Sequence, residues 1–304
     1  MVKAQYPKEI NIQGEFVRQV SAFRKWVTAD GSSGFPTESG RYHLYVSLAC
    51  PWAHRTIIYR KLKKLENAIS MSVVDPIREE RGWRFNDEFP DSLNGFSLLS
   101  EAYRATNPEF EGRVTVPVLW DKKTGGIVNN ESSELIRMLN SEFDAFGDPA
   151  IDFYPYSMRK EIDNMNEMIY NSVNNGVYRC GFATAQKAYE KAFNDLWGAL
   201  EKLEELLGDQ TYLVGDTLTE ADWRLFPTLV RFDPVYYSHF KCNKHRLVDC
   251  PNLWNYIKRL YAVPGIAETV DMDHIKHHYF MTHEKLNPSR IVPVGPAISF
   301  NGDK

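Results

Sequence analysis

The sequence predicts two domains, an α/β domain followed by an all-α domain. Residues 41–142 alternate short apolar runs typical of strands with amphipathic stretches typical of helices, in the order β-α-β, long connection, β-β-α. From residue 158 onward the apolar residues recur at helical spacing, most clearly at Phe193, Leu196, Trp197, Leu200, Leu203 and Leu207. The stretch between the two halves, residues 143–157, is rich in Asp, Gly and Pro and is predicted to be a linker.

Each element of the α/β half has a local signal. Residues 42–47 and 69–74 read as strands, and residues 51 to about 66 form a helix with one apolar face. Residues 76–112 have no clean period, and so long a connection is usually functional or disordered. A strand-like run at 114–120, a glycine turn at 125–126 and a short strand from 127 lead into a helix near 132. This order is that of a thioredoxin-like domain.

The all-α half is expected to cover residues 158–283, and Thr219 with Asp222 forms a capping box that starts one of its helices. Residues 1–40 precede the α/β domain as an N-terminal extension. Residues 284–304 form a tail that we expect to be extended on the surface or disordered.

Composition narrows the classes of function. The chain has 304 residues, 43% of them hydrophobic and 25% charged, which is ordinary for a globular enzyme. A formal net charge of -4 offers no general attraction to nucleic acid or to an anionic membrane. No apolar run has the length of a signal peptide or a membrane span. We therefore expect a cytoplasmic protein that binds neither nucleic acid nor membrane.

Cys50 is the most informative residue, because the apolar run before it breaks into Cys-Pro-Trp-Ala. Pro51 suits the first position of a helix, which places Cys50 at or beside the N-cap. There the backbone N–H groups and the positive end of the helix dipole favour the thiolate over the thiol. Cys50 is therefore a candidate nucleophile, and the alternative is a small buried hydrophobic residue.

The other cysteines offer Cys50 no partner. A redox Cys-x-x-Cys motif would need a second cysteine at position 53, where this chain has Ala53. The thiol that completes an exchange must then come from outside, and glutathione is the obvious candidate. Cys180, Cys242 and Cys250 are scattered without metal-ligand spacing and are expected to stay reduced.

Two further segments suit the binding of a peptide-like thiol. Pro117, between two valines of a strand, must lie at an edge or follow a cis bond, and a cis bond would let the Val116 backbone pair with an extended peptide. Glu131 and Ser132 open the next helix, where they could receive an ammonium and a carboxylate. Taken alone, each segment also has a purely structural interpretation, as an edge-strand proline and a helix cap.

The chain resembles the glutathione transferases, and within them the glutathionyl-hydroquinone reductases of the Xi class. The similarity runs from about residue 16 to residue 280 and rests above all on Cys-Pro-Trp-Ala-His-Arg at 50–55. Further matching blocks are residues 40–49, 82–83, 112–121, 129–132, 174–178, 222–226 and 232–237.

The resemblance implies a fold, a reaction and a set of residues. The fold is a thioredoxin-like domain followed by an all-α glutathione-transferase domain. The reaction is the glutathione-dependent reduction of a glutathionylated hydroquinone through a mixed disulfide on Cys50, and the assembly is a homodimer. Glutathione would be held by Trp83, Arg113, the backbone at Val116 and Pro117, Glu131 and Ser132. A proton for the expelled aryl carbon would come from Tyr178, Tyr279 or Tyr237, the last preferred slightly over Tyr236.

Alternatives remain open at this point. An Omega-like thioltransferase or dehydroascorbate reductase could use the same cysteine, and a non-catalytic binding module could keep the same fold. His54 could help to ionise Cys50 or could lie on the surface. His274, His277 and His278 lack acidic or thiol companions at helical spacing, so no metal is expected. No glycine-rich phosphate loop predicts a flavin or a nucleotide.

Overall fold

The chain forms two compact units in the computed structural model, which describes residues 9–301. The first unit holds Val20–Asp152 together with Glu268–His278. The second holds Phe153–Ala267 together with residues 9–19 and 279–301. The units therefore meet along the chain within the predicted linker, but each also takes a segment from the opposite end of the sequence. Residues 268–278, expected in the helical domain, are part of the first unit.

A four-stranded mixed sheet organises the first unit. Its strands are β1 (Tyr42–Val46), β2 (Ile69–Val73), β3 (Val118–Asp121) and β4 (Gly126–Asn129), in the order β2-β1-β3-β4. β1 pairs in parallel with β2 and antiparallel with β3, and β3 pairs antiparallel with β4. Every residue of β1 is buried, as expected for a central strand. The predicted thioredoxin-like α/β architecture is confirmed.

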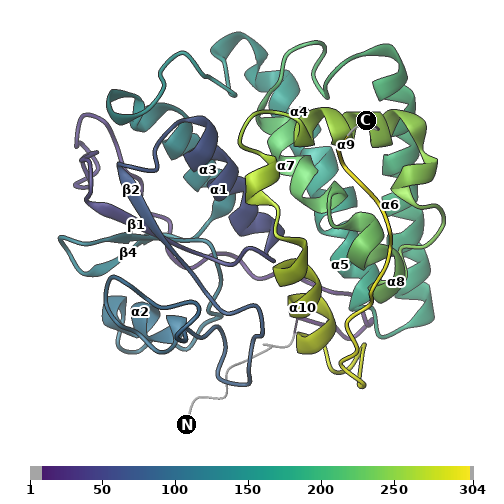
Figure 1. The fold of residues 1–304 in the computed structure, drawn as a ribbon, viewed down its shortest axis with the longest axis horizontal. Helices are drawn as coiled ribbons and strands as arrows, with labels where there is room; N and C mark the ends of the chain where they lie inside the picture. The colour runs from purple at the N-terminus through teal and green to yellow at the C-terminus, as the bar shows by residue number, and fades with distance from the viewer. Residues whose placement is uncertain (1–8, 302–304) are drawn as a thin grey trace. The chain divides into compact units, whose positions relative to one another are not determined.

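Helices cover both faces of this sheet (Figure 1). α1 (Pro51–Leu62) and α3 (Ser132–Arg137, continued by a π-helical turn over Met138–Glu142) lie on one face, and α2 (Leu99–Thr106) lies on the other. α1 ends about four residues earlier than its pattern predicts, because Lys64 has the left-handed φ of 56° that ends a helix. Only residues 47–50 separate the end of β1 from the start of α1, so the first turn of α1 and Cys50 lie close to that end of the strand.

The helix α2 is absent from our sequence prediction, which left residues 76–112 without regular structure. Its start is stabilised by the Glu101 carboxylate, which accepts the backbone N–H groups of Leu98 at 2.8 Å and Ser97 at 3.1 Å. Its buried face consists of Leu99, Ala102 and Tyr103. A helix of eight residues contains only about two turns, so its apolar pattern is hard to recognise within a polar segment that contains glycines.

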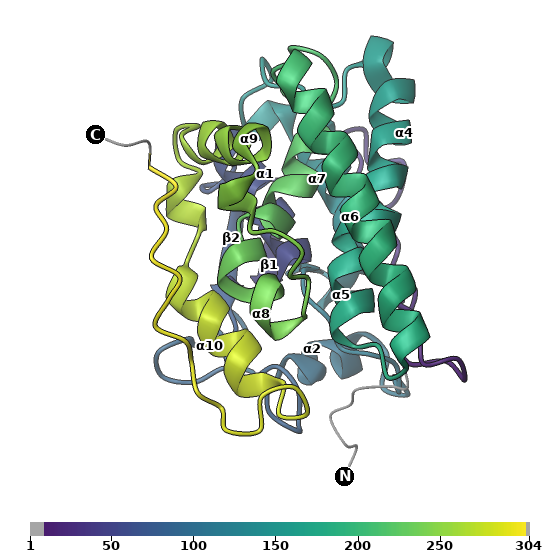
Figure 2. The same cartoon turned by 90° about the vertical axis from the view of Figure 1, so that its right-hand side faces the viewer.

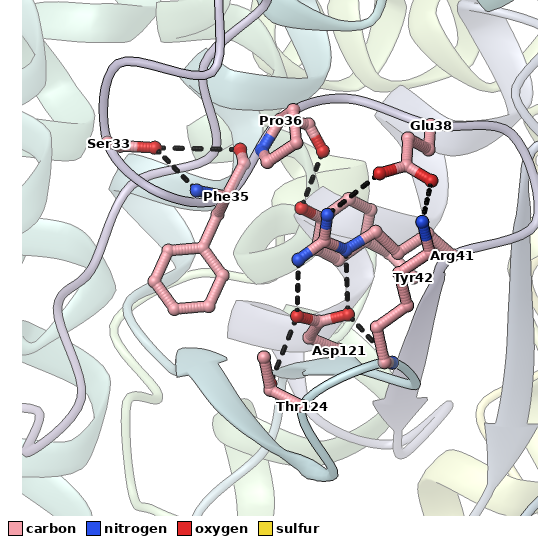
Figure 3. Close-up of polar contacts among 9 residues, drawn as sticks. Ser33, Phe35, Pro36, Glu38, Arg41, Tyr42, Asp121 and Thr124 are labelled. Atoms are coloured by element: carbon pink, nitrogen blue, oxygen red, sulfur yellow. Dashed lines mark hydrogen bonds and ion pairs between the residues drawn. The ribbon is translucent and has the colours of Figure 1, made fainter.

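A buried ion pair joins the two central strands at the end far from Cys50 (Figure 3). The Arg41 guanidinium donates two hydrogen bonds to Asp121, from Nε at 2.8 Å and from Nη2 at 2.7 Å. Glu38 accepts a third from Nη1 at 2.9 Å, and Thr124 donates to Asp121 at 3.0 Å. Bidentate pairing of this kind is directional as well as strong, so it sets the register between the start of β1 and the end of β3.

The second unit is helical, as predicted. It contains α4 (Arg159–Ile169), α5 (Gly176–Gly181), α6 (Gln186–Asp209), α7 (Glu220–Leu229), α8 (Tyr237–His239) and α9 (Pro251–Tyr261). The boundary between the units falls inside α10 (Met272–Thr282). α5 and α9 pack against α6, and α4 packs against α7 (Figure 2). The apolar face predicted for α6 is buried at Leu196, Trp197, Leu200, Leu203 and Leu207.

Two further features of the helices follow from their sequences. The predicted capping box at the start of α7 is confirmed, since the Asp222 carboxylate accepts the Thr219 N–H at 2.7 Å. The 24-residue α6 carries charges along its exposed face. Among residues 9–301, no helix combines the length and the apolar character needed to cross a membrane.

Candidate active site

Cys50 occupies the N-cap of α1, where the sequence predicts it. Its φ of −77° and ψ of 118° are extended, and Pro51 is the first helical residue. The Cys50 side chain itself makes no capping hydrogen bond to this helix start, and the first turn contains no acidic residue. The Cys50 Sγ is partly buried and lies 3.7 Å from the carbonyl oxygen of Val116. A sulfur in this position meets the positive end of a helix and one strand-edge carbonyl.

The Val116–Pro117 peptide bond is cis, which confirms the prediction made from the sequence. It directly precedes β3, and both of its residues are buried. The loop before it is held by α2, because the Tyr103 hydroxyl donates to the carbonyl of Thr115 at 2.8 Å. The backbone of Val116 therefore lies opposite the thiol, in the arrangement that binding of an extended cysteinyl peptide requires.

Glu131 is the N-cap of α3, and three hydrogen bonds fix its carboxylate. Oε1 accepts the N–H of Ser133 at 3.1 Å and its hydroxyl at 2.9 Å, and Oε2 accepts the Ser21 hydroxyl at 2.8 Å. Burial alone would raise the pKa of Glu131, but these hydrogen bonds and the charge of Arg55 lower it below its usual value. Glu131 is thus a carboxylate, ready to accept an ammonium group.

Arg55 and Ser132 supply a positive charge and a hydroxyl group close to Glu131. Ser132 is buried at the first position of α3, and its hydroxyl lies 3.4 Å from the Arg55 Nη1. Arg55 is itself buried, with its guanidinium carbon 4.5 Å from the centroid of the Trp52 ring. A buried cation beside a helix N-terminus favours an anionic group there.

Sequence reasoning missed both Ser21 and Arg55. Ser21 belongs to the predicted N-terminal extension, 110 residues before the carboxylate that it contacts, and no local pattern marks it. Arg55 lies in the Cys-Pro-Trp-Ala-His-Arg motif, so an arginine five residues after Cys50 was the available signal.

Trp83 and Arg113 come from the long connection between β2 and β3. Trp83 is buried, and its ring stacks on the imidazole of His278 with the centroids 5.0 Å apart. Arg113 is half-buried. Burial raises the pKa of Tyr103, and the Arg113 charge is near enough to oppose that rise. Trp83, Arg113 and Cys50 all belong to the first unit.

His54 is fully buried, so the surface location considered from the sequence is wrong. Its Nε2 lies 2.8 Å from the Thr269 hydroxyl, in the C-terminal segment of the first unit. Its backbone N–H donates to the Cys50 carbonyl at 2.9 Å as part of the helix. The ring therefore fixes the segment 268–278 to the helix that begins after Cys50.

Three tyrosine hydroxyls meet in the second unit, and we call them the tyrosine cluster: Tyr178, Tyr236 and Tyr279. The Tyr279 oxygen lies 2.7 Å from that of Tyr178 and 2.9 Å from that of Tyr236. The sequence-predicted Tyr237 is partly buried and makes none of the hydrogen bonds described for this cluster. The π-helical turn over Phe232–Tyr236 decides which of the two neighbours points to Tyr279, and a sequence pattern does not reveal that turn.

Two members of the tyrosine cluster, Tyr236 and Tyr279, are neutral phenols. Burial raises the pKa of both Tyr236 and Tyr279 well above its usual value, and the neighbouring Tyr178 adds to the rise. The fully buried Arg231 opposes it. Tyr178 is the most exposed of the three, and Phe16 packs against its ring at 6.2 Å. Such a chain of hydroxyls can donate a proton at neutral pH.

All four cysteines are free, with Cys180 and Cys242 buried in the helical unit. In the part of the chain that the structure describes, no three His, Cys, Asp or Glu side chains are grouped so that they could hold a metal ion.

Two family models match the chain. The glutathione S-transferase N-terminal domain matches residues 49–142, and the glutathione S-transferase C-terminal domain matches residues 186–259. A thioredoxin-like domain with a cysteine at the N-cap of its first helix, followed by this helical domain, defines a glutathione transferase.

Similar proteins narrow the class. Glutathionyl-hydroquinone reductase YqjG of Escherichia coli K12 is 54% identical over 93% of this chain and 89% of its own length. Glutathionyl-hydroquinone reductase PcpF of Sphingobium chlorophenolicum is 52% identical over 93% of this chain and 90% of its own length. The chain therefore belongs to the glutathione transferase superfamily and, within it, to the family of the glutathionyl-hydroquinone reductases, the Xi class.

Solved structures agree with this assignment. The glutathione-bound structure of YqjG from Escherichia coli K-12 has a TM-score of 0.90 and 53% identity, covering 92% of this chain and 94% of that one. The Xi glutathione S-transferase of Phanerochaete chrysosporium has a TM-score of 0.89 and 50% identity, covering 93% and 98%.

Proposed function

We propose that this protein reduces glutathionyl-hydroquinones to hydroquinones at the expense of glutathione. The observation that carries the proposal is Cys50 at the N-cap of α1, facing the Val116 carbonyl, with Ala53 where a resolving cysteine would stand. The identities to YqjG and PcpF, both named glutathionyl-hydroquinone reductases, support the substrate class.

The reaction has two balanced steps. The Cys50 thiolate attacks the sulfur of the glutathionyl group, and the carbon–sulfur bond breaks. Its electron pair stays with the aromatic carbon, which takes a proton, and glutathione remains on Cys50 as a mixed disulfide. A second glutathione thiolate attacks that disulfide, releasing oxidised glutathione and the Cys50 thiolate. The aryl carbon is reduced by two electrons, and two glutathione sulfurs, one from the thioether and one from the free thiol, are oxidised to the disulfide.

The glutathione site that we propose uses the charges around α3. Glu131, held as a carboxylate, would accept the γ-glutamyl ammonium. Ser132 at the helix start, with Arg55 beside it, would hold the γ-glutamyl carboxylate. The backbone at Val116 and Pro117 would pair with the cysteinyl part, while Trp83 and Arg113 add contacts. Glutathione would be the co-substrate, with no metal, flavin or nucleotide.

We further propose that the tyrosine cluster supplies the proton for the aryl carbon. Its buried, neutral hydroxyls are donors at physiological pH. Tyr236 replaces the sequence-predicted Tyr237 as the third member, because Tyr236 is hydrogen-bonded to Tyr279. Tyr279→Phe is expected to lower kcat by about 10²-fold, as loss of a general acid does. Tyr237→Phe is the matched control and is expected to stay within about twofold of the native rate.

The decisive experiment compares the native protein with Cys50→Ala. Each is mixed with a glutathionyl-hydroquinone and glutathione, and free hydroquinone and oxidised glutathione are followed by chromatography. Turnover by the native protein that disappears in the variant supports the reductase. A glutathione adduct on Cys50 without turnover would instead favour the Omega-like thioltransferase, and no adduct would favour a binding module.

Assembly and location complete the proposal. The resemblance to the Xi class favours a homodimer, which light scattering on the eluting protein would test. The free cysteines suit a reducing, cytoplasmic location.

A further inference from the structure

The indole of Trp83 is fixed by a residue from the other end of the chain. Trp83 lies between β2 and α2, and its carbonyl accepts the Leu99 N–H at 2.9 Å. Its ring stacks on the imidazole of His278, with centroids 5.0 Å apart and ring planes 21° apart. The Arg78 guanidinium carbon is 5.7 Å from the indole centroid. Both rings are at least nine-tenths buried, so the stacking has little freedom to change.

The imidazole of His278 is itself fixed. Its Nδ1 lies 2.8 Å from the carbonyl oxygen of Pro76. A carbonyl only accepts, so Nδ1 must carry the hydrogen. This hydrogen bond sets the plane of the imidazole, and the stacked indole shares that plane to within 21°. Pro76 and Trp83 belong to the same connection, so His278 contacts it at two points.

The segment that carries His278 is anchored independently to the sheet domain. At its start, the Thr269 hydroxyl is bonded to His54 of α1. In its middle, the His274 ring meets the Phe89 ring edge to face, with centroids 5.3 Å apart. His278 at its end reaches Trp83. Residues 268–278 thus connect the helix that bears Cys50 with the connection that bears Trp83, all within the first unit.

We propose that His278 is a positioning residue for Trp83 and through it sets the affinity for glutathione. This inference rests on the proposed function, in which Trp83 contacts glutathione. His278 holds the indole by stacking, and the hydrogen bond to Pro76 orients the imidazole for that task.

The test separates the ring from the hydrogen bond. His278→Ala removes both, His278→Phe keeps an aromatic face, and His278→Asn keeps a donor near the position of Nδ1. His277→Ala is the matched control, because His277 is the preceding residue of α10 and is hydrogen-bonded within the helix to Asp273. Glutathione binding is measured by calorimetry and turnover by chromatography, and thermal unfolding reports whether each variant is folded.

A positioning role predicts a specific pattern. His278→Ala raises the Kd and the KM for glutathione about fivefold, as loss of an aromatic pair does, while kcat at saturating glutathione stays within about twofold. His278→Phe restores most of the affinity, and His278→Asn does not. Combining His278→Ala with Trp83→Ala adds nothing to the effect of Trp83→Ala alone.

Three results would overturn the proposal. They are an unchanged Kd in His278→Ala, an unchanged Kd in Trp83→Ala, and a His278→Ala effect that persists in full when Trp83 is absent. Failure of the proposed function looks different, because the native protein would then bind glutathione and show the pattern above without reducing a glutathionyl-hydroquinone.

Discussion

Two helices of this protein begin with the same pair of residues, a cysteine at the N-cap and a proline at the first helical position. They are α1, with Cys50 and Pro51, and α9, with Cys250 and Pro251. Both cysteines are free, partly buried and extended in backbone conformation. The surroundings of the two sulfurs differ, and that difference shows what a cysteine at a helix start needs in order to react.

At the start of α9, a carboxylate has already taken the place that a thiolate would use. Glu204 of α6 accepts the N–H of Asn252 at 2.9 Å and that of Leu253 at 2.7 Å. Burial raises the pKa of Cys250 to about 11, and Glu204 and Asp233 add to the rise. The Cys250 Sγ lies 3.6 Å from the Arg246 carbonyl, its acceptor. This thiol therefore stays protonated at neutral pH.

At the start of α1, Cys50 makes no capping hydrogen bond through its side chain, and the first turn contains no acidic residue. The neighbour across from Cys50 is the backbone of Val116 rather than a glutamate. The same dipeptide thus starts both helices, but at α9 a glutamate faces the N–H groups and adds to the rise in the pKa of the thiol beside it.

Removing each thiol should give the largest difference between the two sites. Cys50→Ala is expected to lower kcat/KM for a glutathionyl-hydroquinone by at least about 10³-fold, because the variant lacks the proposed nucleophile. Cys250→Ala should stay within about twofold. Steady-state rates with both variants check this. Comparable losses of activity in the two variants would contradict the different roles assigned to Cys50 and Cys250.

Alkylation should rank the two thiols next. At pH 7 iodoacetamide is expected to modify Cys50 on the order of 100 times faster than Cys250, since only the thiolate reacts. Between pH 7 and 10 the Cys250 rate should rise about tenfold per pH unit, because its pKa is about 11 and the thiolate fraction grows with pH below that value. Peptide mass spectrometry measures both rates. A Cys250 rate that levels off below pH 9 would contradict the assignment.

Neutralising Glu204 should reduce the difference in alkylation rate between Cys50 and Cys250. Glu204→Gln removes a charge that raises the pKa of Cys250, so alkylation of Cys250 at pH 8 should become about threefold faster. The weakened cap should also cost about 1 kcal/mol of unfolding free energy. Glu205→Gln, at an exposed position of the same helix, is the control. An unchanged Cys250 rate would show that burial alone protects the thiol.

The smallest effect concerns the other acidic helix start. Glu131 caps α3 much as Glu204 caps α9, but its second oxygen is held by Ser21. Ser21→Ala removes a hydrogen bond that lowers the pKa of Glu131, so that pKa should rise. The KM for glutathione should increase about threefold at neutral pH, and more as the pH falls, with kcat unchanged. The exposed Ser32→Ala is the control, and equal KM values for the two variants would count against this role of Ser21.

Much of the first unit could be predicted because its signals are local. A cysteine and a proline after an apolar strand place the helix start, and the cis bond at Pro117 was one of the two alternatives that a proline inside a strand-like run allows. The helix α2 could not be predicted in the same way. Its start depends on the Glu101 carboxylate folding back on Leu98 and Ser97, and its stability on the burial of Tyr103.

By itself, the sequence determined the class of each half, the position of Cys50 and the starts of α1, α3 and α7, because these depend on residues within a few positions of one another. Tertiary structure alone decided that Tyr236 rather than Tyr237 meets Tyr279, that Ser21 holds Glu131, and that His278 stacks on Trp83. Those contacts join segments far apart in the chain. Along a helix, a shift of one residue turns the side chain to a different side. Local patterns set where an element begins, whereas packing sets which side chains meet.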